Sequence, residues 1–258
     1  MERSTLRILD LLDEHDTKGT FYVLGWVADK LPGLVKEIDR RGHELGSHSY
    51  WHRLVYEQTP AQFRSDLRRS IRVLEDACGK QVRCYRAPSF SITRRSLWAL
   101  EILVEEGIEI DSSIFPTHHD RYGIPDAQRE IHQIETPAGS LTEFPPSVFR
   151  MGKVNVPISG GGYFRAKPYG VYRRLVRRAM AKSGQPLMFY IHPWEVDDDQ
   201  PRMEIRSPVS RLRHYLNLHR TEDKLSRLLE DVRFATVSGV VAERFDGIPD
   251  SATALSIA

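Results

Sequence analysis

Short apolar runs that predict strands alternate with segments of helical periodicity along most of this chain. A helix over 4–14 comes before the first strand, which is a buried run over 19–25. The alternation continues as far as a helix over 222–232 and a strand over 234–237. Strands that alternate with helices pair in parallel through right-handed crossovers. The sequence therefore predicts an α/β fold, as a TIM-like barrel or a doubly wound sheet.

The middle of the chain follows the same alternation and is interrupted once. Residues 112–165 are rich in Pro, Gly and His, which predicts a long loop region with short strand-like pieces at one rim. The tail 251–258 predicts disorder. The other expected elements are a helix over 27–41, a strand over 44–47, a helix from Thr59-Pro60 to Gly79, a strand over 82–85, a helix over 93–106, a strand over 108–110, a helix over 168–182 and a strand over 186–191.

Composition limits the classes of partner and location. With 258 residues and 40% apolar side chains, the chain can bury one substantial core. A formal charge of +2 gives no electrostatic reason to expect nucleic acid as a partner. The N-terminus has no apolar signal region and no run is long enough to span a bilayer, which predicts a soluble, cytoplasmic chain unless its true start lies upstream. The oligomeric state cannot be inferred from the sequence.

Four polar residues directly follow, or come within one residue of, predicted strands. They are His48, Arg86, Asp111 and His192. In a parallel α/β fold, chemistry gathers where strands end and loops begin. We therefore expect these four side chains to share one rim.

The pair His48 and His52 is four residues apart, close enough on a compact loop to grip one metal ion. No glutamate lies between them as in the HExxH proteases, so the spacing is weak evidence taken alone. The alternative is a pair of rim histidines that hydrogen-bond to the backbone.

The other strand-end residues also have a functional and a structural interpretation. Arg86 would orient a carboxylate, or form an ordinary salt bridge. Asp111 would orient a histidine across the rim and tune its pKa, or cap a turn. His192 ends the most apolar strand and would act as a general acid, or hold the following turn. The run Gly160-Gly161-Gly162-Tyr163-Phe164-Arg165 lacks the ending of a phosphate loop, which leaves a flexible loop on the substrate side or a plain turn.

These motifs, in this order, resemble the NodB-homology polysaccharide deacetylases, carbohydrate esterase family 4, and most closely the branch associated with exosortase-linked exopolysaccharide clusters. The resemblance covers nearly the whole chain. The segments that carry it are GTFYVLGW at 19–26, GHELGSHSYWH at 42–52, YRAPSFSIT at 85–93, IDSSIFP at 110–116, GGGYFR at 160–165 and FYIHPWEVDDDQPR at 189–202.

The resemblance implies a distorted TIM-like (β/α) barrel over 1–200, with 201–258 as a C-terminal extension packed on the same domain. It implies that His48 and His52 bind a divalent metal, normally zinc, and that Arg86 steadies the catalytic carboxylate. It further implies that His192 is the general acid and that Asp111 tunes it. Polysaccharide or oligosaccharide is the implied substrate. The aromatic residues expected to contact it are Tyr50, Phe90, Tyr163 and Trp194. The family often has an aromatic residue where Ser89 stands.

One family motif is absent from the sequence. An Asp-rich strand end that supplies the catalytic base and a third metal ligand should precede the helix over 4–14, but only Met1-Glu2-Arg3 do so. We therefore expect a barrel without its first strand and with an unpaired edge. The expected reaction is removal of N-acetyl groups from a hexosamine polymer, impaired by this loss. The alternative is a catalytically silent carbohydrate-binding remnant; another two-histidine metallohydrolase, such as a phosphoesterase, is a third.

Overall fold

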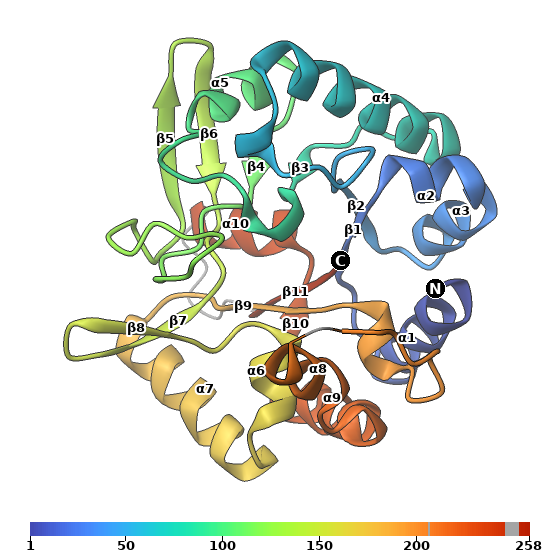
Figure 1. Ribbon diagram of the computed structural model, residues 1–258, viewed down its shortest axis with the longest axis vertical. Coiled ribbons are helices and arrows are strands. Elements are labelled where there is room, and N and C mark those ends of the chain that lie inside the picture. The colour runs from blue at the N-terminus through green and yellow to red at the C-terminus, as the bar shows by residue number, and fades with distance from the viewer. Residues whose placement is uncertain (206, 246–252) are drawn as a thin grey trace.

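The computed structural model describes residues 1–205, 207–245 and 253–258, and shows a curled sheet with helices around its outside (Figure 1). In this described part the main sheet has nine strands, ordered β10-β11-β1-β2-β3-β4-β6-β5, and β9 pairs with β11. All neighbours are parallel except β5 and β6. The predicted α/β class is confirmed, in the form of a curled, barrel-like sheet.

The strands are short and agree in place with most of the predicted ones. Their bounds are β1 Thr20–Val23, β2 Glu44–Ser47, β3 Cys84–Tyr85, β4 Ile110–Asp111, β5 His132–Thr136, β6 Gly139–Glu143, β9 Met188–Ile191, β10 Phe234–Ala235 and β11 Thr253–Ile257. A separate hairpin is formed by β7 Val148–Met151 and β8 Val154–Pro157. The region predicted as loop therefore contains two hairpins, and one of them extends the main sheet.

The helices cover the sheet and begin and end where the local chemistry predicts. In α4, the Thr59 hydroxyl accepts from the Gln62 amide and the Gln62 side chain accepts from the Thr59 amide, while Gly79 ends the helix at φ 70°. The helix predicted over 27–41 is two helices, because Pro32 disfavours helical geometry at the residue before it. The helices are α1 Glu2–Glu14, α2 Gly25–Lys30, α3 Pro32–Arg40, α4 Pro60–Cys78, α5 Trp98–Glu105, α6 Gly161–Ala166, α7 Tyr169–Ser183, α8 Pro208–Tyr215, α9 Thr221–Asp231 and α10 Val237–Phe245, with 3-10 turns η1 Val55–Glu57, η2 Pro88–Phe90, η3 Pro193–Val196 and η4 Leu218–Arg220.

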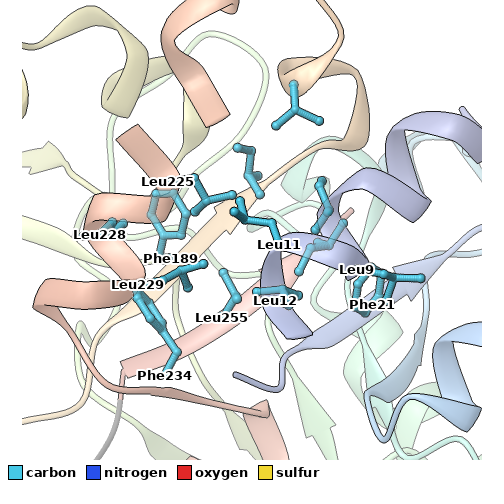
Figure 2. Close-up of a cluster of buried hydrophobic side chains, with 14 of the residues drawn as sticks. Leu9, Leu11, Leu12, Phe21, Phe189, Leu225, Leu228, Leu229, Phe234 and Leu255 are labelled. Atoms are coloured by element: carbon cyan, nitrogen blue, oxygen red, sulfur yellow. The ribbon is translucent and has the colours of Figure 1, made fainter. Parts of the chain in front are cut away.

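The strand β11 contradicts the predicted disorder of the tail. Residues 251 and 252 lie outside the described part, but all of Thr253–Ile257 is buried and pairs in parallel with β1, β9 and β10. Leu255 is 1% exposed and lies among the buried side chains of α1, β9 and α9 (Figure 2). The tail is ordered because these long-range contacts bury it, and no local pattern in five residues shows that.

The edge of β1 that was expected to be open is partly covered by β11. Thr20 pairs with Ser256 and Phe21 with Ile257, whereas all four residues of β1 pair with β2. The described part of 201–258 also supplies Leu225, Leu228 and Phe234 to the main core. No helix in the described ranges is long and apolar enough to cross a membrane.

Candidate active site

A cleft of about 390 Å³ opens beside the carboxyl ends of β1, β2 and β9. Its lining brings together His48, His52, His192 and Trp194, four of the residues predicted from the sequence. Most of the remaining lining is apolar, and includes Phe21 from β1. Of the four strand-end residues expected to share one rim, His48 and His192 line the cleft together with His52, whereas Arg86 and Asp111 are not in its lining.

His48 follows β2 and is held by a backbone carbonyl. Its Nδ1 lies 2.7 Å from the carbonyl oxygen of Arg86, so Nδ1 carries the proton and Nε2 keeps a free lone pair. Burial, with the neighbouring His52, lowers the pKa of His48 to about 3. The two ring centroids are 5.1 Å apart at an interplanar angle of 69°. Burial also lowers the pKa of His52, so both rings are neutral donors at pH 7.

The loop between these histidines has a strained backbone. Ser49 and His52 have φ values of 64° and 59°, which side-chain-bearing residues rarely adopt and which cost about 1–3 kcal/mol each. Asp66 of α4 holds the loop, because its carboxylate accepts from the amides of Tyr50 at 2.6 Å and Trp51 at 3.2 Å. Asp66 could not be recognised from the sequence, since nothing in a helix marks one carboxylate as the anchor of a distant loop.

These residues do not complete a catalytic metal site. Zinc enzymes usually supply three protein ligands, and here His48 and His52 supply two imidazole nitrogens. Within residues 1–205, 207–245 and 253–258, no group of three or more His, Cys, Asp or Glu side chains is arranged to hold an ion. The free Nε2 of His48 and a ring nitrogen of His52 suit a divalent ion, but the donor set is short by one.

His192 lies across the cleft at the end of β9 and is held by a carboxylate. Its Nδ1 is 3.1 Å from Oε2 of Glu195, and Nε of Arg165 is 2.9 Å from Oε1 of the same group. The side chains of Glu195 and Arg165 are each 2% exposed, while that of His192 is 39% exposed. Burial alone would raise the pKa of Glu195, but the hydrogen bond from His192 and the charge of Arg165 bring it below its usual value.

Arg86 is fully buried, and its described partners are not carboxylates. Nε donates to the carbonyl of Ser112, Nη2 to the Ser112 hydroxyl at 2.7 Å and Nη1 to the Ser256 hydroxyl at 2.6 Å. The guanidinium also lies 4.4 Å from the ring centroid of Tyr22. No ion pair of Arg86 occurs among the described residues, so the bidentate carboxylate expected from the sequence is not found there.

Asp111 pairs with a carboxyl group, and the predicted contact with a histidine is absent from the described structure. Asp111 lies opposite Glu143 in the parallel register of β4 and β6. The Ser113 hydroxyl donates a hydrogen bond to the Asp111 carboxylate. Burial raises the pKa of both carboxyl groups, and each also interacts with the other. Two buried carboxylates that face each other repel when both are ionised, so a proton on one of them is favoured and the two titrate as a pair. Glu143 was missed because its strand lies in the region predicted as loop.

Trp194 is the one predicted aromatic residue that lines the cleft. It stacks between His192 and His214, with ring centroids at 5.7 and 4.3 Å. Phe90 packs on Phe115 and Tyr190 in a small buried cluster.

Tyr50 and Tyr163 lie elsewhere. Tyr50 is 1% exposed, bonds Asp29 through its hydroxyl and lies under Arg69, so it supports the histidine loop from inside. Tyr163 is half-buried on α6. Trp51 is 49% exposed beside His52 and was not singled out from the sequence.

Two protein families match this chain, one in each half. Residues 112–242, about half of the chain, match the family described as Domain of unknown function (DUF3473), and residues 1–109 match the Polysaccharide deacetylase family. A peptidoglycan-N-acetylglucosamine deacetylase of Bacillus cereus is 34% identical over 98 residues, which are 38% of this chain and 36% of that relative. The chain thus spans about a third of the length of that curated relative.

Solved structures share the fold at low identity. A polysaccharide deacetylase structure from Mycobacterium smegmatis aligns with a TM-score of 0.65 and 22% identity, over 97% of this chain and 79% of the other. A Bacillus anthracis protein described as a CE4 family pseudoenzyme aligns with a TM-score of 0.51 and 15% identity, over 100% of this chain and 65% of the other. These structures show the shared fold, while the family matches over residues 1–109 and 112–242 show that the chain belongs to the polysaccharide deacetylase family and carries a DUF3473 region.

Proposed function

We propose that this protein is a hydrolase that removes N-acetyl groups from a hexosamine-containing polysaccharide, in exopolysaccharide synthesis or modification. The observation that carries the proposal is the meeting of His48, His52 and His192 at one cleft. Trp194 lies beside His192 in the cleft lining, where its half-buried indole is placed to contact a sugar ring. Membership of the deacetylase family supports the reaction class, while the polymer and the cytoplasmic location remain predictions.

The roles follow from which nitrogen atoms are free. His192 keeps Nδ1 on Glu195, so in the protonated ring Nε2 carries the second proton and would deliver it to the departing amine as the amide bond breaks. His48 keeps Nδ1 on a carbonyl, so Nε2 is available for an ion, together with His52. A divalent ion, zinc by the family resemblance, supplies Lewis-acid activation of water and carbonyl when bound. Two donors hold such an ion weakly.

Weak activity is part of the proposal. Among the described residues, neither Arg86 nor the two metal-binding histidines have a carboxylate partner that would act as a base. Loss of a general base typically lowers the rate on the order of a hundredfold to ten-thousandfold. The same observation favours a second candidate, a catalytically silent protein that binds carbohydrate in the cleft.

Acetate release from chitooligosaccharides with added Zn²⁺ separates the two candidates. We expect slow release by the wild type and loss of release in His48→Ala and His192→Ala, with His219→Ala, an exposed histidine outside the cleft, as the control. Absence of acetate combined with oligosaccharide binding that depends on Trp194 would support the silent binder. Neither release nor binding would refute both.

A further inference from the structure

We propose that Glu195, seated by Arg165 and by the glycine at position 161, is the positioning residue of His192. It fixes the ring with Nδ1–H toward the protein and Nε2 toward the cleft. The inference rests on the proposed function only for what His192 then does to a substrate. The orientation of the ring itself is a property of this chain alone.

The first support is that both oxygen atoms of the Glu195 carboxylate accept hydrogen bonds from identified donors. Oε1 accepts from Nε of Arg165 at 2.9 Å. Oε2 accepts from the backbone amide of His192 at 3.0 Å and faces Nδ1 of the same residue at 3.1 Å. An ionised carboxylate only accepts, so the proton between them belongs to Nδ1. The two bonds from one residue fix both the backbone and the ring of His192.

The second support is the anchoring of Arg165 in turn. Nη1 donates to the carbonyl of Leu216 at 2.6 Å and of His214 at 3.1 Å, and Nη2 to that of Arg213 at 3.2 Å. The guanidinium is thus tied to the carbonyls that end α8, while Nε is left for the carboxylate. Figure 1 shows α6, which carries Arg165, lying next to α8.

The third support is energetic. Desolvating two charges costs several kcal/mol per ion, and an apolar pair of similar volume often gives equal or greater stability. A buried ion pair is therefore poorly explained by stability alone. Glu195 of this pair contacts His192, a half-exposed histidine that lines the cleft. Positioning that ring therefore explains the buried pair.

The fourth support is the space left for the carboxylate by α6. A Cβ atom at Gly161 would lie 2.1 Å from Oε2 of Glu195, far inside contact distance, whereas one at Gly162 would meet nothing within 4 Å. The glycine run at 160–162 was interpreted as a flexible loop or a plain turn. In the structure it is the start of a helix that approaches a buried carboxylate closely.

The competing explanation is that the ion pair only clamps α6 to η3. Nitrogen NMR of the His192 imidazole distinguishes the two, because it reports which ring nitrogen carries the proton. We expect the wild-type neutral ring to be in the Nδ1–H form. In Glu195→Ala the ratio of this form to the other should fall roughly tenfold or more, as expected when a hydrogen bond to a charged group is lost.

The glycine variants give a matched test that keeps Glu195 in the chain. Gly161→Ala should shift the ring in the same direction as Glu195→Ala, and Gly162→Ala should leave it unchanged. If Gly161→Ala folds, as judged by near-ultraviolet circular dichroism, but leaves the tautomer as in the wild type, the inference is wrong. Should Glu195→Ala fail to fold, the comparison of Gly161→Ala with Gly162→Ala decides alone.

The NMR readout needs no substrate, so failure of the proposed function is distinguishable from failure of this inference. A wild type without deacetylase activity, whose His192 ring still responds to Glu195 and Gly161, refutes the function and supports the positioning. If acetate is released, Glu195→Ala should lower kcat more than it changes KM and should shift the pH profile. A purely structural clamp would leave that profile in place.

Discussion

The two sides of the cleft hold their histidines in opposite ways. On the β2 side, His48 is neutral, buried and bound to a backbone carbonyl, in a loop of strained backbone that Asp66 anchors. On the β9 side, the backbone leading to His192 is extended, and the ring depends on the buried pair of Glu195 and Arg165. The free-energy cost of the β2 side lies in strained backbone conformation, and that of the β9 side lies in the desolvation of two charges. Substitutions should therefore affect the two sides differently.

The largest effect is expected on the β9 side. Arg165→Met leaves the Glu195 carboxylate buried without its cation, which should lower the free energy of unfolding by about 3–5 kcal/mol. Urea unfolding measures the change. Arg174→Met, an exposed arginine on α7, serves as the control and should stay within about 0.5 kcal/mol of the wild type. Equal effects of the two variants would show that charge burial is not what holds this side.

The two sides should also separate in metal binding. His48→Ala and His52→Ala should each weaken Zn²⁺ binding by at least roughly tenfold to a hundredfold, because loss even of an outer partner of a ligand has that effect. His192→Ala should leave the affinity close to that of the wild type. Isothermal titration calorimetry gives all three values. A loss in His192→Ala as large as in His48→Ala would make His192 a third ligand and remove the division between the sides.

A smaller effect is expected from the anchor of the β2 side. Asp66→Ala leaves the amides of Tyr50 and Trp51 without their acceptor, which should cost about 1–3 kcal/mol in unfolding free energy. The control is Asp76→Ala, an exposed aspartate on the same helix. If both variants unfold at the wild-type urea midpoint, the strained loop is held by something other than Asp66.

The smallest effect concerns the carboxyl pair at the ends of β4 and β6. Burial raises the pKa of Asp111 and of Glu143, so the folded state holds protons that the unfolded state releases, and their contribution to stability falls as pH rises above about 4. Glu143→Gln mimics the protonated form. It should therefore gain about 1 kcal/mol relative to the wild type between pH 5 and pH 8.

Urea unfolding at the two pH values tests this, with Glu109→Gln at an exposed position just before β4 as the control. A difference between wild type and Glu143→Gln that does not change with pH would contradict the shared proton.

The sequence predicts the parts of the site that depend on order along the chain. His48 and His192 directly follow strands whose apolar runs are local patterns, and parallel pairing then brings the strand ends together. His52 was predicted from its spacing of four residues from His48. The partners of these residues could not be predicted in this way. Arg165 and Glu195 are thirty positions apart on separate elements, and only the packing of α6 against η3 places them in contact.

The two exceptions within the fold have the same cause. Glu143 faces Asp111 because β6 joins the sheet beside β4, although its surroundings have a loop-like composition. The strand β11 is too short for its alternation to be informative, and its burial is decided by β1 and β9. Contacts between segments distant in the sequence thus determine the position of Glu143 and the burial of β11, which local sequence patterns do not predict.

The position of β11 in the chain also bears on how the protein is made. The strand β1 ends at Val23 and β11 begins at Thr253, so the residues between them are synthesised before β11. At about 5–20 residues per second, the uncovered flank of β1 waits on the order of ten seconds or longer for its neighbour on the ribosome. The nascent chain therefore passes through a stage in which this flank offers hydrogen bonds to other polypeptides, and chaperone demand should peak then.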